Sequence, residues 1–274
     1  MTGALVRAFL AMLVMAMPSA ILPGVGADTQ QMVALVALFT GALVFVEYNA
    51  VYPSLVEFRD APPFNRLRFG LLFVMVLFLS LMLSADLAPT PLNRLFEALG
   101  LLIGQALDFP YSPVRLATLV MADGLDPVRT AQVRAVAGTG YLLSVAALVL
   151  FVAILRIKGW PARHLAFNVW VNLPTFEPTA GGDVVGRLER DARVNLSLGI
   201  LLPFLIPAAM SVMSLSFAPL TQGSPQTLIW TVAGWAFLPA SLVMRGVAMA
   251  RVAAMIRTKR EGAAAAADKA VAAA

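Results

Sequence analysis

Long apolar runs alternate with short polar or proline-rich breaks along most of the chain. Six runs are long enough to be membrane spans: residues 4–25, 31–52, 69–85, 135–155, 195–217 and 227–244. A helix needs about 20 apolar residues to cross a hydrocarbon core of about 30 Å. The pattern predicts an all-α integral membrane protein, with six spanning helices in one polytopic domain of residues 1–261.

Residues 31–68 show the pattern most clearly, and the rest of the chain is organised around them. An apolar run over 32–46 meets Glu47, and a loop over 53–68 follows. Proline lacks an amide donor and disfavours helix in the residue before it, so Pro62 and Pro63 are expected to break any helix there. The next span is expected to start at Phe69. The loop is basic, with Arg59, Arg66 and Arg68.

The first apolar run allows two interpretations. It is a spanning helix bent or ended by Pro18 and Pro23, or it is part of a secretory signal in residues 1–27, cleaved after Val25-Gly26-Ala27. We favour the spanning helix, because multispanning proteins rarely need a cleaved signal and because the helix gives a consistent topology.

Residues 92–134 do not fit a simple span. Arg94, Glu97 and Gln105 interrupt the first apolar piece, and turns follow at 108–113 and 123–127. We expect a re-entrant or interfacial helical hairpin; the alternative is a short additional span at 92–107. Asp126 followed by Pro127 predicts a helix start, with Asp126 as the N-cap and Pro127 at the first helical position.

The three later spans carry glycines, prolines or tryptophans that predict details of helix packing. Pro203 and Pro207 are expected to kink their helix, with Ser211, Ser214 and Ser216 binding the freed backbone groups. Small residues allow close helix approach at Gly138 and Gly140. Trp230 and Trp235 are expected near a membrane interface.

The arginines predict the orientation. Basic residues gather in the loops 53–68 and 156–193 and after residue 244, so these segments and both termini are expected to be cytoplasmic. The hairpin must then cross the bilayer an even number of times. Arginine outnumbers lysine and alanine is abundant, which is typical of a GC-rich bacterium and favours a bacterial cytoplasmic (inner) membrane. Residues 262–274 form an alanine-rich, low-complexity tail, expected to fray.

Composition supports lipid as the solvent and limits the chemistry. The chain is 60% hydrophobic and 13% charged, whereas soluble domains are about 45–50% apolar and about 25% charged. Its net charge is +5, but no basic stretch is interleaved with aromatic residues for stacking on bases, so we expect no nucleic-acid partner. With no cysteine and one histidine, His164, we expect no metal and no cofactor. Dinucleotide, NTP-binding and serine-hydrolase motifs are absent.

Few ionisable residues could carry chemistry. Glu47, with Asn49 beside it, could bind a cation or gate a proton; alternatively it pairs with a loop arginine at headgroup depth. Four hairpin residues could line a vestibule or could be turn, cap and snorkelling residues: Asp108, Arg115, Asp123 and Asp126. Three arginines of a mixed-charge helix over 184–193 could contact lipid or a partner, or be solvated: Arg187, Arg190 and Arg193.

Three functions stay open. The favoured hypothesis is a scaffold or assembly factor for a membrane complex, because no catalytic constellation is evident. The alternatives are a transporter of a small solute, ion or lipid that uses Glu47, and a lipid-modifying enzyme that uses Asp123 or Asp126. The expected partners are the lipid bilayer and, for a scaffold, other membrane-protein subunits.

Overall fold

A computed structural model describes residues 1–161, 168–176, 181, 183–212 and 224–273. Nine helices are present in these segments: α1 Thr2–Ile21, α2 Ala27–Asn49, α3 Phe64–Ser84, α4 Pro91–Leu107, α5 Pro113–Met121, α6 Pro127–Ile157, α7 Val169–Asn172, α8 Val184–Val212 and α10 Pro225–Ala273. Six of them, α1, α2, α3, α6, α8 and α10, are long and apolar enough to cross a membrane. The prediction of an all-α membrane protein with six spans is confirmed.

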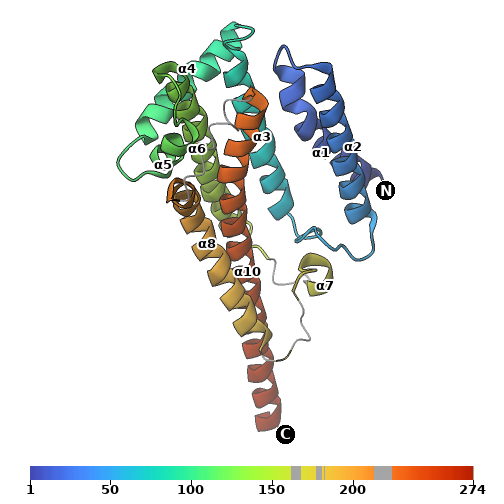
Figure 1. Ribbon diagram of the computed structural model, residues 1–274. Coiled ribbons are helices and arrows are strands. Elements are labelled where there is room, and N and C mark those ends of the chain that lie inside the picture. The colour runs from blue at the N-terminus through green and yellow to red at the C-terminus, as the bar shows by residue number, and fades with distance from the viewer. Residues whose placement is uncertain (162–167, 177–180, 182, 213–223, 274) are drawn as a thin grey trace.

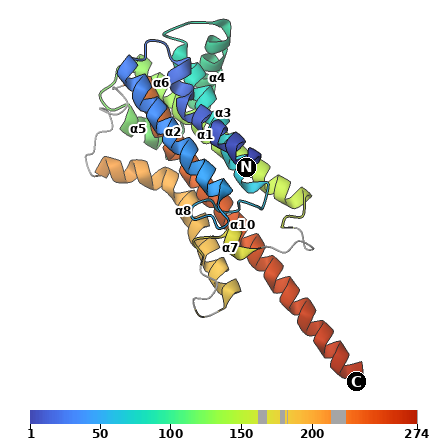
Figure 2. The same ribbon diagram turned by 90° about the vertical axis from the view of Figure 1, so that its right-hand side faces the viewer.

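The helices form a bundle with a helical pair at its side (Figure 1). α1 and α2 pack against each other, and α1 joins them to α3. α3, α6 and α10 pack together in the centre, and α8 lies along α10. α4 and α5 pack on α6, and α5 also meets the second half of α8, which bends away from the first half (Figure 2).

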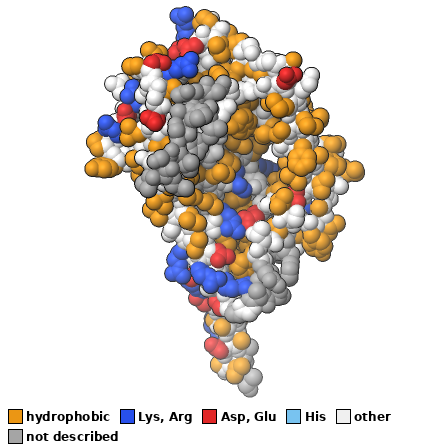
Figure 3. All heavy atoms as spheres, viewed as in Figure 1, with side chains coloured by type: hydrophobic (Ala, Val, Ile, Leu, Met, Phe, Trp, Pro, Cys, Tyr) orange, Lys and Arg blue, Asp and Glu red, His pale blue; other side chains and the backbone are white. Residues whose placement is uncertain are grey.

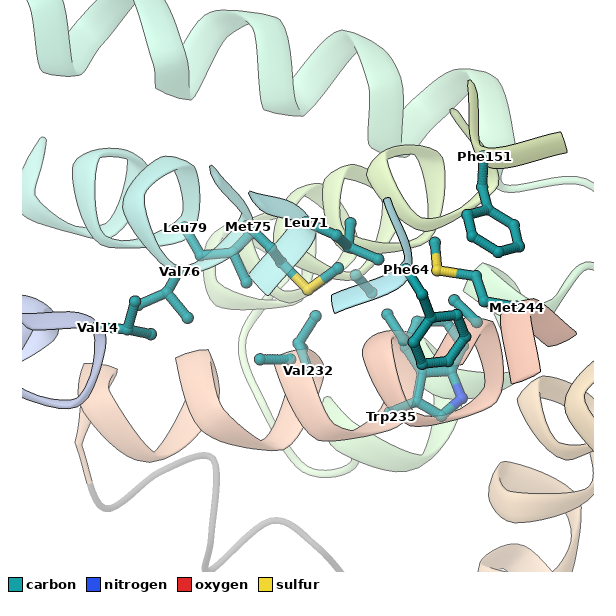
Figure 4. Close-up of a cluster of buried hydrophobic side chains, with 14 of the residues drawn as sticks. Val14, Phe64, Leu71, Met75, Val76, Leu79, Phe151, Val232, Trp235 and Met244 are labelled. Atoms are coloured by element: carbon teal, nitrogen blue, oxygen red, sulfur yellow. The ribbon is translucent and has the colours of Figure 1, made fainter. Parts of the chain in front are cut away.

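The central helices share a core of large apolar side chains (Figure 4). Met75 and Leu79 of α3, Phe151 of α6, and Val232 and Met244 of α10 are all completely buried. By contrast, α2 exposes most of its surface, and the ring of Phe39 is 72% exposed. An apolar helix with so little protein around it is stable when lipid covers it, as expected for a membrane protein.

Four helices begin in the same way, with a polar capping residue followed by proline. Thr90 accepts a bond from the amide of Asn93, and Ser112 accepts one from Arg115. Asp126 accepts bonds from the amides of Val128 and Arg129, at 2.9 and 3.0 Å, so the N-cap predicted there is confirmed. At the start of α10, Ser224 accepts a bond from the amide of Thr227 and precedes Pro225. Each cap satisfies amides that have no partner within the helix.

The hairpin α4–α5 is held by a close glycine crossing. α4 has 17 residues and is not among the six candidate spans. A Cβ on Gly104 would lie 2.7 Å from the carbonyl oxygen of Arg134, and one on Gly138 would lie 2.7 Å from the Cα of Gly104. A Cβ on Gly140 would likewise lie 2.9 Å from a Val232 methyl group. Both predicted close-approach glycines therefore lie at helix contacts, as small residues do in membrane bundles.

Three helices extend beyond the segments predicted for them. α3 begins at Phe64, directly after the proline pair, and not at Phe69. The mixed-charge segment after residue 184 is continuous with the following span in α8. α10 runs on through the alanine-rich segment to Ala273, which was expected to fray. Hydropathy marks where lipid ends, whereas charged residues and alanine continue a helix well outside it.

In α8, the carbonyl that a proline leaves without a helical donor is satisfied by a residue that the sequence did not predict. Pro207 has no amide hydrogen, so the carbonyl of Pro203 loses its partner four residues on. The buried indole N–H of Trp235 donates to that carbonyl at 3.1 Å. The donor to this carbonyl is thus a tryptophan and not one of the expected serines: Ser211 is exposed, and Ser214 and Ser216 lie outside the described residues. Trp235 is 4% exposed, so its side chain packs in the core of the bundle.

The first part of α8 and the last part of α10 form a charged two-helix stalk, residues 184–193 with 245–273. Arg257 pairs with Glu189, and Arg260 donates to Asp183 at 2.6 Å. Leu188 packs into the seam and is fully buried. α10 has 49 residues, or about 74 Å at 1.5 Å per residue, more than twice the hydrocarbon thickness. The last turns of α10 therefore extend beyond the other helices, as both ribbon views show (Figures 1 and 2).

Candidate functional site

Polar residues gather at one end of the bundle, where the loop over 50–63 meets residues 158–161 and 168–176 and the stalk begins. We call this the basic end. Its centre is Glu57, whose side chain is 10% exposed. Arg245 of α10 holds this carboxylate with two bonds, Nε to Oε2 at 2.6 Å and Nη2 to Oε1 at 2.8 Å. Thr175 donates its hydroxyl to Oε1 at 2.6 Å, so three segments distant in sequence meet at one carboxylate.

Aromatic packing and main-chain bonds fix the loops around Glu57. The ring of Phe58 lies 4.4 Å from that of Phe64 and 6.0 Å from that of Trp160, and Phe58 and Phe64 are fully buried. The amide of Phe58 donates to the main-chain carbonyl of Asn172 at 2.7 Å, and the amide of Asp60 donates to the side-chain oxygen of Asn172 at 3.1 Å. The loop over 50–63 and the segment 168–176 thus bind each other as well as the helices.

Glu47 is buried and closes the loop that follows it. Its carboxylate accepts bonds from the amides of Ser54, Leu55 and Val56 at 3.0, 2.9 and 3.1 Å, and from the Ser54 hydroxyl at 2.5 Å. Arginine was the expected partner in the structural alternative, but main-chain donors take that place. A carboxylate is acceptor-only and satisfies several amides of a tight loop at once. Asn49, the other candidate here, is exposed on the last turn of α2.

Arg59 binds the end of α2 and not the Glu47 carboxylate. Its guanidinium donates to the carbonyls of Glu47 at 3.2 Å and Ala50 at 2.5 Å. The last carbonyls of a helix lack intrahelical partners and attract positive charge. Arg251 acts in the same way on α6 and the turn after it, donating to the carbonyls of Leu155 and Trp160, both at 3.2 Å.

The four hairpin candidates do not converge on one site. Asp108 is half-buried between Arg134, at 3.1 Å, and Arg115, at 3.8 Å. Asp126 is a helix cap, and Asp123 is exposed in the turn before it. The structure thus brings Asp108 and Arg115 together, and leaves the other two carboxylates in turn and capping positions.

A pocket of about 360 Å³ lies between the end of α3, α4 and the start of α6, away from the basic end. Asp86 and Glu97 are its two acidic lining residues, and Gln132 donates to Asp86 at 2.8 Å. The other lining groups are mainly apolar, including Met82 and Leu101. Asp86 was not among the predicted site residues, because nothing in the spacing shows that α3 and α6 meet there.

The three stalk arginines lie in different surroundings. Arg187 stacks over the Phe176 ring at 4.8 Å, whereas Arg190 and Arg193 are exposed. At the base of α8, the hydrogen bond from Arg260 lowers the pKa of the Asp183 carboxyl below its usual 3.8, with help from the amide of Gly186. Arg190 and Arg193 are therefore the members of this set whose charge lies at the surface.

Comparison with known proteins gives no relative for this arrangement: no family model, no curated protein and no solved structure matches the chain. Within the described segments, no group of three His, Cys, Asp or Glu side chains could hold a metal ion. His164 lies outside them. Glu57 and Arg245, the centre of the basic end, were not among the predicted site residues, because their link spans 188 positions.

Proposed function

We propose that this protein is a non-catalytic scaffold of a bacterial cytoplasmic membrane, which holds a partner protein at the basic end and along the stalk. One observation carries the proposal. The two buried carboxylates at this end, Glu47 and Glu57, are engaged by donors of the same chain and fix loops in place. Donors of the same chain that already occupy these carboxylates favour a structural role over cation binding.

The charge distribution supports a cytoplasmic location for the basic end and for both termini. Arg59, Arg66 and Arg68 lie here with the charged stalk, and the Arg7 guanidinium at the start of α1 lies 4.7 Å from the Tyr48 ring at the end of α2. Positive charge beside spanning helices favours the cytoplasmic side. In this orientation the stalk projects into the cytoplasm, where exposed Arg190 and Arg193 can meet an acidic partner surface.

Photo-crosslinking in intact membranes tests the scaffold. A photoreactive residue at Arg190 or Arg193 should form adducts with one defined protein, and one at Phe39 on the lipid-facing surface of α2 should not. Reversing the stalk charge with R190E/R193E should abolish the adduct from a probe at Glu261. Formation of the same adducts from all positions, or of none from the stalk, would refute the proposal.

A further inference from the structure

Arg68 is a polar group at the basic end that the loop contacts leave unexplained. It lies on the second turn of α3, with its guanidinium carbon 5.1 Å from the Phe64 ring centre. Its Nε is buried and has no hydrogen-bond partner within the described chain. Leaving a charged donor buried without an acceptor costs several times more than an ordinary hydrogen bond gains. Such a group points to an acceptor supplied from outside the chain.

The nearby acids do not fill this role. Glu57 is close enough to Arg68 to interact with it electrostatically, but its oxygens already hold Arg245 and Thr175. Glu47 is taken by the amides of the loop after it. The Tyr48 hydroxyl lies within electrostatic reach of Arg68, Arg7 and Arg59 and of one acid, Asp60, so the charge around it is mainly positive.

The surface is hollowed between the α1–α2 pair and the rest of the bundle, and Figure 3 shows basic side-chain atoms inside the hollow and apolar side chains around it. Tyr48 lies near the end of α2 and Arg68 near the start of α3, and the two residues interact electrostatically. In an inserted protein, this level of the bundle is where the charged ends of the spans meet headgroups.

We propose that Arg68 binds a phosphate group in this hollow, with the Tyr48 hydroxyl as a second donor. The planar guanidinium offers paired donors that match two phosphate oxygens. An anion there balances the charge that Glu57 leaves unmatched. A phospholipid headgroup and inorganic phosphate share this chemistry; the apolar walls favour the lipid, because they can accommodate its chains. The inference does not depend on what the stalk binds.

Native mass spectrometry of the full chain in detergent tests this inference, with phosphatidylglycerol, phosphatidylcholine or inorganic phosphate added separately. R68Q should lower the phosphatidylglycerol-bound fraction about tenfold. R66Q is the matched control, because Arg66 is exposed on the same helix, and it should leave binding unchanged. R68K keeps the positive charge but loses the paired guanidinium donors, so it should bind at an intermediate level.

The source of the phosphate follows from the separate additions. Arg68-dependent binding of phosphatidylglycerol over phosphatidylcholine assigns a lipid, and Arg68-dependent binding of inorganic phosphate assigns the free anion. Equal losses in R66Q and R68Q, or no loss in R68Q, would overturn the site. If R68Q does not fold, R68K decides in its place: weaker binding than in the unmodified chain supports the site, and unchanged binding overturns it.

Discussion

Arg245 binds Glu57 through two hydrogen bonds of 2.6 and 2.8 Å, which join the loop after α2 to α10. Both side chains are largely withdrawn from solvent, at 26% and 10% exposed. Paired and hydrogen-bonded charges tolerate such burial, whereas removing one partner strands the other. The contact therefore makes the fold of the basic end depend on two residues that are far apart in sequence.

Breaking this pair should destabilise the protein strongly and non-additively. We expect E57Q and R245Q each to lower the unfolding free energy by about 3 kcal/mol, and the double variant to cost clearly less than the sum. Thermal unfolding in detergent micelles measures this. R66Q, at an exposed arginine, should have little effect. Strict additivity would show that the two side chains do not interact in solution.

Transport through Glu47 can be tested separately. The Glu47 carboxylate is occupied by amides of the following loop. We therefore expect vesicles with E47Q, vesicles with the unmodified protein and protein-free vesicles to show the same ion and proton flux. The same vesicles with E57Q serve as a control for general disruption of the basic end. Robust flux with the unmodified chain that E47Q alone abolishes would restore the transporter hypothesis.

Trp235 and Pro207 should be energetically coupled. W235F removes the donor to the Pro203 carbonyl and should cost about 1–3 kcal/mol, whereas W230F, at the half-buried neighbouring tryptophan, should cost less. P207A restores a helical amide for the same carbonyl, so W235F should cost less in that background. Unfolding free energies of the unmodified chain, W235F, P207A and the double variant measure the coupling. An equal cost of W235F with and without P207A would contradict it.

The α4–α6 crossing should be sensitive to one methyl group. G104A places a Cβ within 2.8 Å of α6 backbone, which cannot move aside, so we expect a loss of about 2–3 kcal/mol. G70A is the matched control in a helix, since nothing lies within 4 Å of its Cβ, and it should be neutral or slightly stabilising. Equal stability of the two variants would argue against the close crossing.

The stalk should respond to acid through Asp183. Its folded-state pKa is lowered by Arg260, so the pair stabilises the stalk above the ordinary pKa of 3.8 and loses that effect as pH falls through the lowered value. A carbon-13 titration of this carboxyl should show a midpoint below 3.8, returning toward 3.8 in R260Q and in high salt. A midpoint unchanged by R260Q would rule out the pair.

Much of the fold was predictable, and the reasons are local. Apolar length gave the six spans, and the Asp126-Pro127 pair gave a helix start; Thr90-Pro91, Ser112-Pro113 and Ser224-Pro225 carry the same signal and could have been recognised. Helix ends beyond the lipid were missed, because arginine and alanine continue a helix that hydropathy no longer marks.

The candidate site was harder to predict, because it depends on contacts between distant segments. Glu47 was recognised from its position in an apolar run, but its partners are main-chain amides, which leave no trace in residue type. Glu57, Thr175 and Arg245 come from three separate stretches, and only the packing of α3 and α10 brings them together. Charge pairing across the bundle cannot be derived from spacing along the chain.

Hydrogen exchange at residues 54–56 tests most directly whether the buried carboxylates serve structure. These amides lie in an exposed loop segment and donate to Glu47. In lipid nanodiscs, the unmodified chain should show slow exchange there; E47A should abolish this protection while α3 and α6 stay protected. Equal exchange at 54–56 in both proteins would contradict a clamping role for Glu47 and remove the main support for the scaffold.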